Sequence, residues 1–392
     1  MAQNKKARRS PGPAPSAAVP RSTALAAFGM LLTLAVIAVV AWIETTKPAV
    51  YLRIVQEDEI LEWGTVWAFL GATAFFFLAA YRRMRAGKGL PWFLLGVGLF
   101  CFTVAGEEIS WGQRLLGYRP PSYFLEHNYQ QELNVHNVLD KDLRKSAVSF
   151  ILLGYGLMLP GLALFSGLRR LLERLRIEAP SAALTPAFLA TFVLYDAYPW
   201  DFTGEVVELA MGLGFLFAGM CASGITAGGP KRRAFQLIAA TAATALVFLL
   251  GWANAVYSSG QRSGNPESVT AAGSEIEALR RDFQAMADAN RGRPVTRCGL
   301  HKRVYTYVEQ YDKDELLRGA FASLTAQGLP EDRAAYFIDP WNSPYWIRHR
   351  CDKDDGRVKV FVYSFGPNRR RDSDRWNILG DDVGTVIYER GR

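Results

Sequence analysis

Acidic residues and a histidine are concentrated in one polar stretch, residues 106–142, which joins two apolar segments. Glu107 and Glu108 end the first segment, Arg114 follows them, and His136 lies further along the stretch. Carboxylate oxygens and imidazole nitrogens could hold a divalent transition metal that activates water for hydrolysis. Carboxylates beside an arginine could instead form a proton or substrate path, or a packing pair in which the arginine neutralises them. We therefore treat these four residues as hypothetical catalytic residues.

A second acidic group follows a later apolar segment. Glu205 and Glu208 are three residues apart, so a helix would place both on one face, and Asp196 and Asp201 precede them. The loop after Glu108 also contributes polar side chains: His127, Glu132, Asn134 and Asn137. We expect Glu205 and Glu208 to lie on the same side of the membrane as this loop and to form a second hypothetical metal site. The chain contains no HExxH, GxSxG, Walker or CxxC motif to accompany these groups.

Apolar segments position these groups. A membrane-spanning helix needs about 17–25 mostly apolar residues. Seven segments meet or approach this length: 24–43, 63–81, 90–106, 147–166, 183–200, 205–225 and 235–256. The sequence therefore predicts a polytopic α-helical membrane protein with seven transmembrane helices at residues 23–256, after a disordered basic tail at residues 1–22. The first segment is too long for the apolar region of a signal peptide, and we interpret it as a retained anchor.

Positive charge predicts the orientation. Lysines and arginines gather in the tail and in the loops 82–89, 167–180 and 229–233. Such loops stay in the cytoplasm, so the amino terminus is expected inside and residues 257–392 outside. We expect a bacterial inner membrane, with the carboxy-terminal part in the periplasm and the lipid bilayer as a partner. The net charge of +8 then reflects topology, and no nucleic-acid partner is expected.

The remaining residues predict a separate domain. Residues 257–270 are interpreted as a linker, and residues 271–392 as an extracytoplasmic α+β domain. An amphipathic helix is predicted at 271–289 and a second helix at 313–327. Runs rich in β-branched and aromatic residues predict strands at 303–311, 358–366 and 385–390.

The cysteines fall into two classes. Cys101 and Cys221 lie inside apolar segments and are expected to behave as small apolar residues. Cys298 and Cys351 are the only pair in the polar domain, which the topology places in an oxidising compartment. We predict a disulfide between Cys298 and Cys351, with two buried free thiols as the alternative.

The end of the chain resembles the carboxy-terminal domain of the major pseudopilin of type II secretion. Three elements carry the resemblance: DPWNSPYWI at 339–347, VYSFGPN at 362–368 and GDDVG at 380–384. The resemblance implies a pseudopilin-like fold with a calcium ion in its late acidic loop. The implied ligands are the family's Asp-rich position, Asp381 and Asp382, with Ser364, Asp372, Ser373 and Asp374 nearby.

The match departs from the family pattern at two places. Asn342 and Ser343 stand where the pattern DPWGxPY has glycine and a variable residue, and residues 369–371 are three consecutive arginines beside the proposed ion. The chain also lacks the processed amino-terminal helix that a pseudopilin needs for assembly. The resemblance therefore implies a shared fold and does not imply polymerisation into a pilus.

The membrane half carries a second resemblance. EDEILEW at 57–63, GEEISWGQR and NVHN resemble an uncharacterised family of bacterial multi-pass proteins, which implies no activity. Glu107, Glu108 and Arg114 also resemble the EExxxR motif of CAAX-type intramembrane metalloproteases, with five residues rather than three before the arginine.

Two functions of different kinds follow. The first is an inner-membrane protein that presents a pseudopilin-like, calcium-binding domain to an envelope or secretion partner. The alternative is a membrane-embedded, metal-assisted hydrolase that uses the acidic and histidine cluster. A transporter is disfavoured because the spans show no internal repeat or midplane charge.

Overall fold

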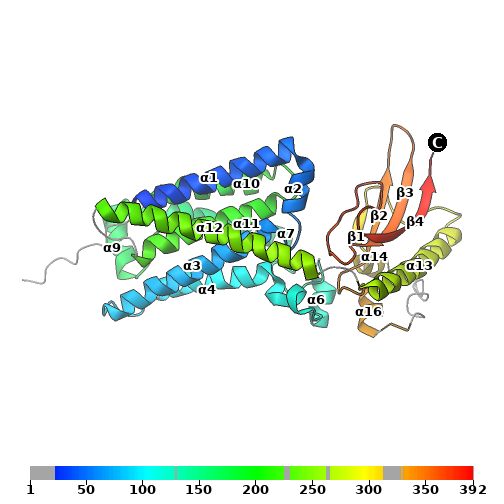
Figure 1. The fold of residues 1–392 in the computed structure, drawn as a ribbon, viewed down its shortest axis with the longest axis horizontal. Coiled ribbons are helices and arrows are strands. Elements are labelled where there is room, and N and C mark those ends of the chain that lie inside the picture. Colours follow the sequence, from blue (N-terminus) through cyan, green and yellow to red (C-terminus); the bar gives the residue numbers. More distant parts are fainter. Residues whose placement is uncertain are drawn as a thin grey trace, which may run out of the picture.

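The computed structural model describes residues 23–128, 130–224, 230–261, 265–311, 328–329 and 331–391. A bundle of helices occupies one end of the molecule, and a small α+β domain, here called the head, occupies the other (Figure 1). The helix predicted at 313–327 lies outside the described residues.

The bundle contains the helices of the first 261 residues. They are α1 (Thr23–Thr46), α2 (Pro48–Ile54), α3 (Ile60–Arg85), α4 (Trp92–Glu108), the 3₁₀ turn η1 (Ser110–Gly112), α5 (Gln113–Leu116), α6 (Ser122–His127), α7 (Lys141–Leu153), the π-helix η2 (Gly154–Met158), α8 (Leu159–Leu162), α9 (Ser166–Arg174), the 3₁₀ turn η3 (Ala182–Leu184), α10 (Thr185–Ala197), α11 (Thr203–Ser223) and α12 (Pro230–Gln261).

Five helical segments of the described chain are long and apolar enough to cross a membrane. They are Thr23–Thr46, Ile60–Arg85, Lys141–Leu162, Thr203–Ser223 and Ala234–Ser258. The two other predicted spans fall on shorter helices, α4 with 17 residues and the apolar segment Ala182–Ala197. Both run alongside the longer helices in the bundle (Figure 1). The structure thus shows a mostly helical chain in which five of the seven predicted spans are helices of spanning length.

Helices α3 and α11 form the centre of the bundle. Over its most apolar stretch α11 is 83% buried and α3 is 61% buried, whereas α1 and α12 are each 28% buried there and leave much apolar surface exposed. Close packing depends on small residues: a Cβ added to Gly29 of α1 would lie 2.3 Å from the Phe217 ring of α11. An apolar outer surface around a packed interior is the arrangement expected of helices in lipid.

Loops that alternate along the chain meet at opposite ends of the bundle. At the end far from the head, Arg82 donates to the carbonyl of Ser223 at 2.6 Å and Arg83 pairs with Glu178 at 2.9 Å. At the end near the head, the Tyr51 hydroxyl donates to the carbonyl of Asp201 at 2.7 Å. The basic loops therefore share one end and the acidic loops share the other.

The head consists of helix α13 (Pro266–Ala289) packed on an antiparallel sheet. Its other elements are β1 (His301–Arg303), α14 (Val304–Tyr311), α16 (Glu331–Tyr336), β2 (Trp346–Cys351), β3 (Val358–Ser364) and β4 (Val383–Arg390), and the strand order is β1-β2-β3-β4. The predicted apolar face of α13 is confirmed, because Ile276, Leu279, Phe283 and Met286 are all buried in the head core.

The structure corrects three local predictions. The strand predicted at 303–311 is almost entirely helix α14, because Val304 and Tyr307 bury themselves at helical spacing. Strand β2 was not predicted, and only its first two residues belong to the motif at 339–347. Helix α12 runs to Gln261 and α13 begins at Pro266, so helix occupies most of the range interpreted as a linker.

Candidate functional site

The polar stretch after α4 begins with a sharp reversal of the chain. Helix α4 ends at Glu108, and Ser110 and Trp111 then take left-handed conformations, with φ of 46° and 53°. The reversal returns the Trp111 ring to α4, where its Nε1 donates to Glu107 Oε1 at 2.8 Å. A Cβ on Gly106 would lie 2.8 Å from that ring, so glycine permits the close approach.

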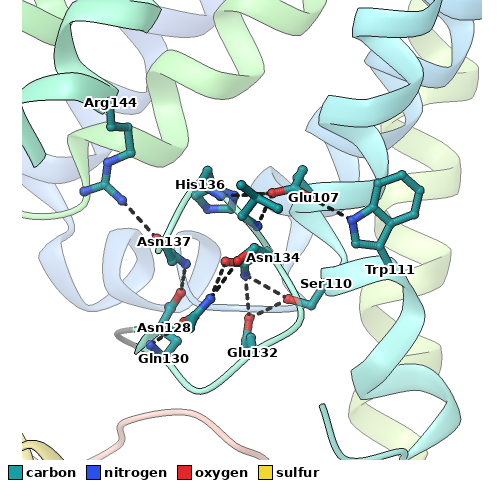
Figure 2. A network of polar contacts seen from close by, with 11 residues as sticks. Glu107, Ser110, Trp111, Asn128, Gln130, Glu132, Asn134, His136, Asn137 and Arg144 are labelled. Atoms are coloured by element: carbon teal, nitrogen blue, oxygen red, sulfur yellow. Dashed lines mark hydrogen bonds and ion pairs between the residues drawn. The ribbon is translucent and has the colours of Figure 1, made fainter. Parts of the chain in front are cut away.

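Glu107 binds the opposite side of the loop through its second carboxylate oxygen. Oε2 accepts from the backbone N–H groups of Val135 at 2.5 Å and His136 at 3.0 Å, and His136 Nδ1 lies 3.4 Å from it (Figure 2). The Glu107 side chain is only 13% exposed. Its carboxylate therefore holds the turn at 135–136 against the end of α4.

A second set of contacts closes the loop beneath this turn. Ser110 Oγ donates to Glu132 Oε2 at 2.6 Å, and Asn134 Nδ2 donates to both, at 3.1 and 3.2 Å (Figure 2). Asn128 Nδ2 in turn donates to Asn134 Oδ1 at 2.8 Å. All four side chains belong to buried residues, so these bonds form largely away from water and are worth more than exposed ones.

The network extends to two other elements. Arg144 of α7 donates to Asn137 Oδ1 at 2.9 Å, and Asn137 donates to Gln130 Oε1. Gln130 Nε2 donates to Glu57 Oε1 at 2.5 Å, in the segment between α2 and α3. The motifs at 57–63, 106–114 and 134–137 thus meet in one structure. We call the residues labelled in Figure 2 the polar cap. They are Glu107, Ser110, Trp111, Asn128, Gln130, Glu132, Asn134, His136, Asn137 and Arg144.

The predicted catalytic residues come together only in part. Glu107 contacts His136, and Glu208 lies within electrostatic range of His136 and Arg144. Among the described residues, however, groups of three or more ligands that could hold one metal ion occur only in the head. The structure therefore does not assemble Glu107, Glu108, His136, Glu205 and Glu208 into such a group. Arg114 belongs to α5, and its side chain lies outside the described part.

The acidic loop of the head does assemble three carboxylates. Asp372, Asp381 and Asp382 each place an oxygen within 4.8 Å of the others. Burial raises the pKa of Asp382 to about 6, and burial together with the neighbouring Asp372 raises the pKa of Asp381 to about 7. Carboxylates held this close repel one another unless a proton or a cation lies between them.

Two other predicted calcium ligands bind elsewhere. Ser364 Oγ donates to Asp339 Oδ2 at 2.5 Å, and Asp374 Oδ1 accepts from the backbone of Trp376 and Asn377, each at 2.6 Å. Asp339 Oδ1 also accepts from the backbone N–H groups of Trp341 and Ser343, at 2.9 and 2.8 Å. Asp339 therefore ties the motif at 339–347 to the motif at 362–368, a role that was not predicted.

The head contacts the polar cap and its surroundings. Arg370 pairs with Glu59, Arg303 donates to the carbonyl of Asn128, and Tyr336 donates to Glu126 Oε1 at 2.7 Å. A small cavity lies between the two halves, lined by both: Glu57, Gln113, Glu132, Asn342, Trp346 and Arg369.

The predicted disulfide between Cys298 and Cys351 is present, with Cα atoms 5.5 Å apart. Cys101 is a buried free thiol in the bundle, and Cys221 is a partly buried one.

The fold and these sites define a helical membrane protein with a disulfide-bonded α+β head seated on one end of its bundle. No protein-family model, no curated protein and no solved structure matches this chain.

Proposed function

We propose that this protein is a seven-span bacterial inner-membrane protein that holds a pseudopilin-like, calcium-binding head on its periplasmic end, for interaction with an envelope or secretion partner. One observation carries the proposal: both positions at which the head departs from the pseudopilin pattern contact the membrane half. The residues that differ from the pattern, at 342–343 and 369–371, would then attach the head to the helical bundle.

Asn342 is the first of these positions. It stands where the family pattern has glycine and adopts the left-handed conformation that glycine favours, with φ of 63°. Asparagine tolerates this conformation better than most residues. Its side chain accepts from Arg119 at 3.4 Å and donates to the carbonyl of Gly117 at 3.2 Å, so the turn is kept and two contacts to the bundle are added.

The three arginines are the second position. Arg370 pairs with Glu59, the Arg371 guanidinium lies 5.8 Å from the centre of the Phe202 ring, and Arg369 lines the cavity between the halves. The Arg370 and Glu59 side chains are 14% and 13% exposed, which makes this ion pair stronger than a surface pair. The positive charge beside the proposed calcium loop is thus directed toward the acidic end of the bundle.

Seven crossings are favoured by the alternation of the loops. The basic loops at 82–89 and 167–180 lie at one end and the head at the other, as an up-and-down path through α4 and α10 requires. The positive-inside rule then places the head in the periplasm. The disulfide agrees with that compartment, because such bonds persist in oxidising environments.

Calcium is the proposed ion because the three carboxylates of the acidic loop supply the hard oxygen ligands that this cation prefers. The hydrolase alternative has less support. Both oxygens of Glu107 accept hydrogen bonds from the loop and the indole, which suits a structural role better than activation of water.

Thermal unfolding of the full chain in detergent tests calcium binding. About 1 mM calcium should raise the melting temperature of the head by roughly 5–10 °C over a chelator control. The double variant Asp381→Ala/Asp382→Ala should lose this shift, whereas Asp374→Asn should keep it. Identical melting of the unaltered chain with calcium and with chelator would refute the ion site.

A reporter enzyme that is active only in the periplasm, fused after Arg392, tests the topology. The fusion should be active, and the same reporter fused after Lys88 should be inactive. An inactive carboxy-terminal fusion would place the head in the cytoplasm.

A further inference from the structure

A histidine stands directly against the disulfide of the head. His349 Nε2 lies 3.4 Å from Cys351 Sγ and 3.8 Å from Cys298 Sγ. His349 and Cys351 are two residues apart on β2, so their side chains share one face of the sheet. Within the described part of the chain, these two sulfur atoms are the only hydrogen-bonding partners of Nε2.

The histidine is held in place from every side. The backbone N–H of His349 donates to the carbonyl of Leu300, and the backbone N–H of Gly299 donates to the carbonyl of His349, both at 2.9 Å. His349 is only 5% exposed, and its Nδ1 lies 2.7 Å from Thr296 Oγ1. When Nδ1–H donates to this hydroxyl, the lone pair of Nε2 points at the two sulfurs, an arrangement typical of metal-binding histidines.

We propose that reduction of the Cys298–Cys351 bond creates a zinc site with three protein ligands: Cys298 Sγ, Cys351 Sγ and His349 Nε2. A dithiol reductant would supply the two electrons and two protons that convert the bond into two thiols, and would itself become a disulfide. Zinc binding would then release the two thiol protons, because the metal binds thiolates.

The distances fit a tetrahedral ion. Zinc–sulfur bonds of about 2.3 Å and zinc–nitrogen bonds of about 2.0–2.1 Å separate sulfur from nitrogen by about 3.6 Å and sulfur from sulfur by about 3.8 Å. The two observed sulfur–nitrogen distances lie on either side of that value. Only the two sulfurs must move apart, which the broken bond allows. Cys298 is in an exposed segment, so the fourth position would face solvent.

Cobalt, a spectroscopic substitute for zinc, tests the site in the full chain. The two membrane cysteines are first replaced, Cys101→Ala and Cys221→Ala, so that only the head can contribute thiolates. After reduction with a phosphine and its removal under anaerobic conditions, a thiolate-to-cobalt charge-transfer band should appear and saturate at one thiolate-bound Co²⁺ per chain. Zinc should displace it. The oxidised chain should give no such band.

Cobalt binding by variants distinguishes the three proposed ligands from other residues of the head. His349→Ala should weaken cobalt binding by about 100-fold or abolish it, and Cys351→Ser should remove most of the charge-transfer band. His301→Ala, which alters the other histidine of the head, should leave binding unchanged. Absence of cobalt binding by the reduced chain overturns the proposal, as does equal binding by the folded His349→Ala variant. Because Cys351→Ser keeps His349, it decides the case if His349→Ala does not fold.

Discussion

Glu107 of the polar cap and Asp382 of the acidic loop are both largely buried carboxylates, yet their surroundings differ. The oxygens of Glu107 accept from an indole and from two backbone N–H groups, and a histidine ring adjoins them. Asp382 also accepts two backbone N–H groups, but it faces Asp372 and Asp381 across less than 4.8 Å. The first carboxylate is surrounded by donors, whereas the second belongs to a group with an excess of negative charge.

This difference separates a structural role from a binding role. A charge whose lone pairs are all used fixes the chain around it and contributes to folding. A group of carboxylates that repel one another is destabilising until a proton or a cation joins it. The difference favours a structural role for the polar cap and the proposed ligand-binding role for the acidic loop.

Loss of Glu107 should have the largest effect. In Glu107→Ala the donors of Val135, His136 and Trp111 lose their acceptor, which should lower the free energy of unfolding by about 2–4 kcal/mol. The loop should become sensitive to trypsin, which can cleave after Arg114 and Lys141. Thermal unfolding in detergent and the cleavage rate measure both effects.

Glu173→Ala is the matched control for this variant, because Glu173 is an exposed glutamate of α9. It should melt like the unaltered chain. If Glu107→Ala also melts like the unaltered chain, the polar cap is not a structural element.

Loss of Arg370 should have the next largest effect. Arg370→Ala leaves Glu59 without its cation at a largely buried position, at an expected cost of about 2–3 kcal/mol to docking of the head. Hydrogen exchange should then increase in the docked segments near residues 117–136 and not in the core of α3 and α11. The exposed Arg375 offers the control Arg375→Ala, and the double variant Glu59→Arg/Arg370→Glu should recover part of the protection. Unchanged exchange in Arg370→Ala would show that the ion pair does not hold the head.

Long-range contacts limited how much could be predicted from the sequence. The apolar segments and the face of α13 follow from local composition and periodicity, so they were predictable. The disulfide was predictable because only two cysteines lie in the polar domain. The pairing of Arg370 with Glu59 joins residues far apart in the chain, and no local pattern shows which acidic group an arginine reaches.

Backbone conformation explains other errors. The chain reversal after Glu108 was not predicted, because it depends on left-handed angles at Ser110 and Trp111, which accompany the hydrogen bond from Trp111 to Glu107. The predicted calcium ligand Ser364 was assigned by proximity in the sequence, whereas the buried Asp339 takes its hydroxyl. In the sequence, this contact is indicated only by an aspartate in the DPW motif at 339–341 and a serine in the later motif at 362–368.

A smaller effect is expected from pH. Asp381 and Asp382 have pKa values of about 7 and about 6 in the folded chain against a usual 3.8, so folding favours their protonated forms. Their contribution to stability is full below about pH 3.8 and is lost as the pH rises toward about 7. Without calcium, the head should therefore melt at a lower temperature at pH 7 than at pH 5.

Calcium should flatten this dependence, because the cation replaces the protons. Burial also raises the pKa of Asp339 to about 7, and Asp339→Asn provides the comparison that removes this separate contribution. A head that becomes more stable between pH 5 and pH 7 in chelator would contradict the assignment of the acidic loop to ligand binding.

The smallest effect is expected from Asn342→Gly, which introduces the residue that the pseudopilin pattern has at this position. Glycine adopts the left-handed conformation at no steric cost, so the turn should keep its stability to within about 0.5 kcal/mol. The contacts to Arg119 and Gly117 are lost, so hydrogen exchange should increase slightly around residue 117. Asn342→Ala loses the same contacts and adds backbone strain of about 1 kcal/mol. A head that melts lower in both variants by equal amounts would show that Asn342 serves the docking contact alone, whereas a drop confined to Asn342→Ala would show that it serves the turn alone.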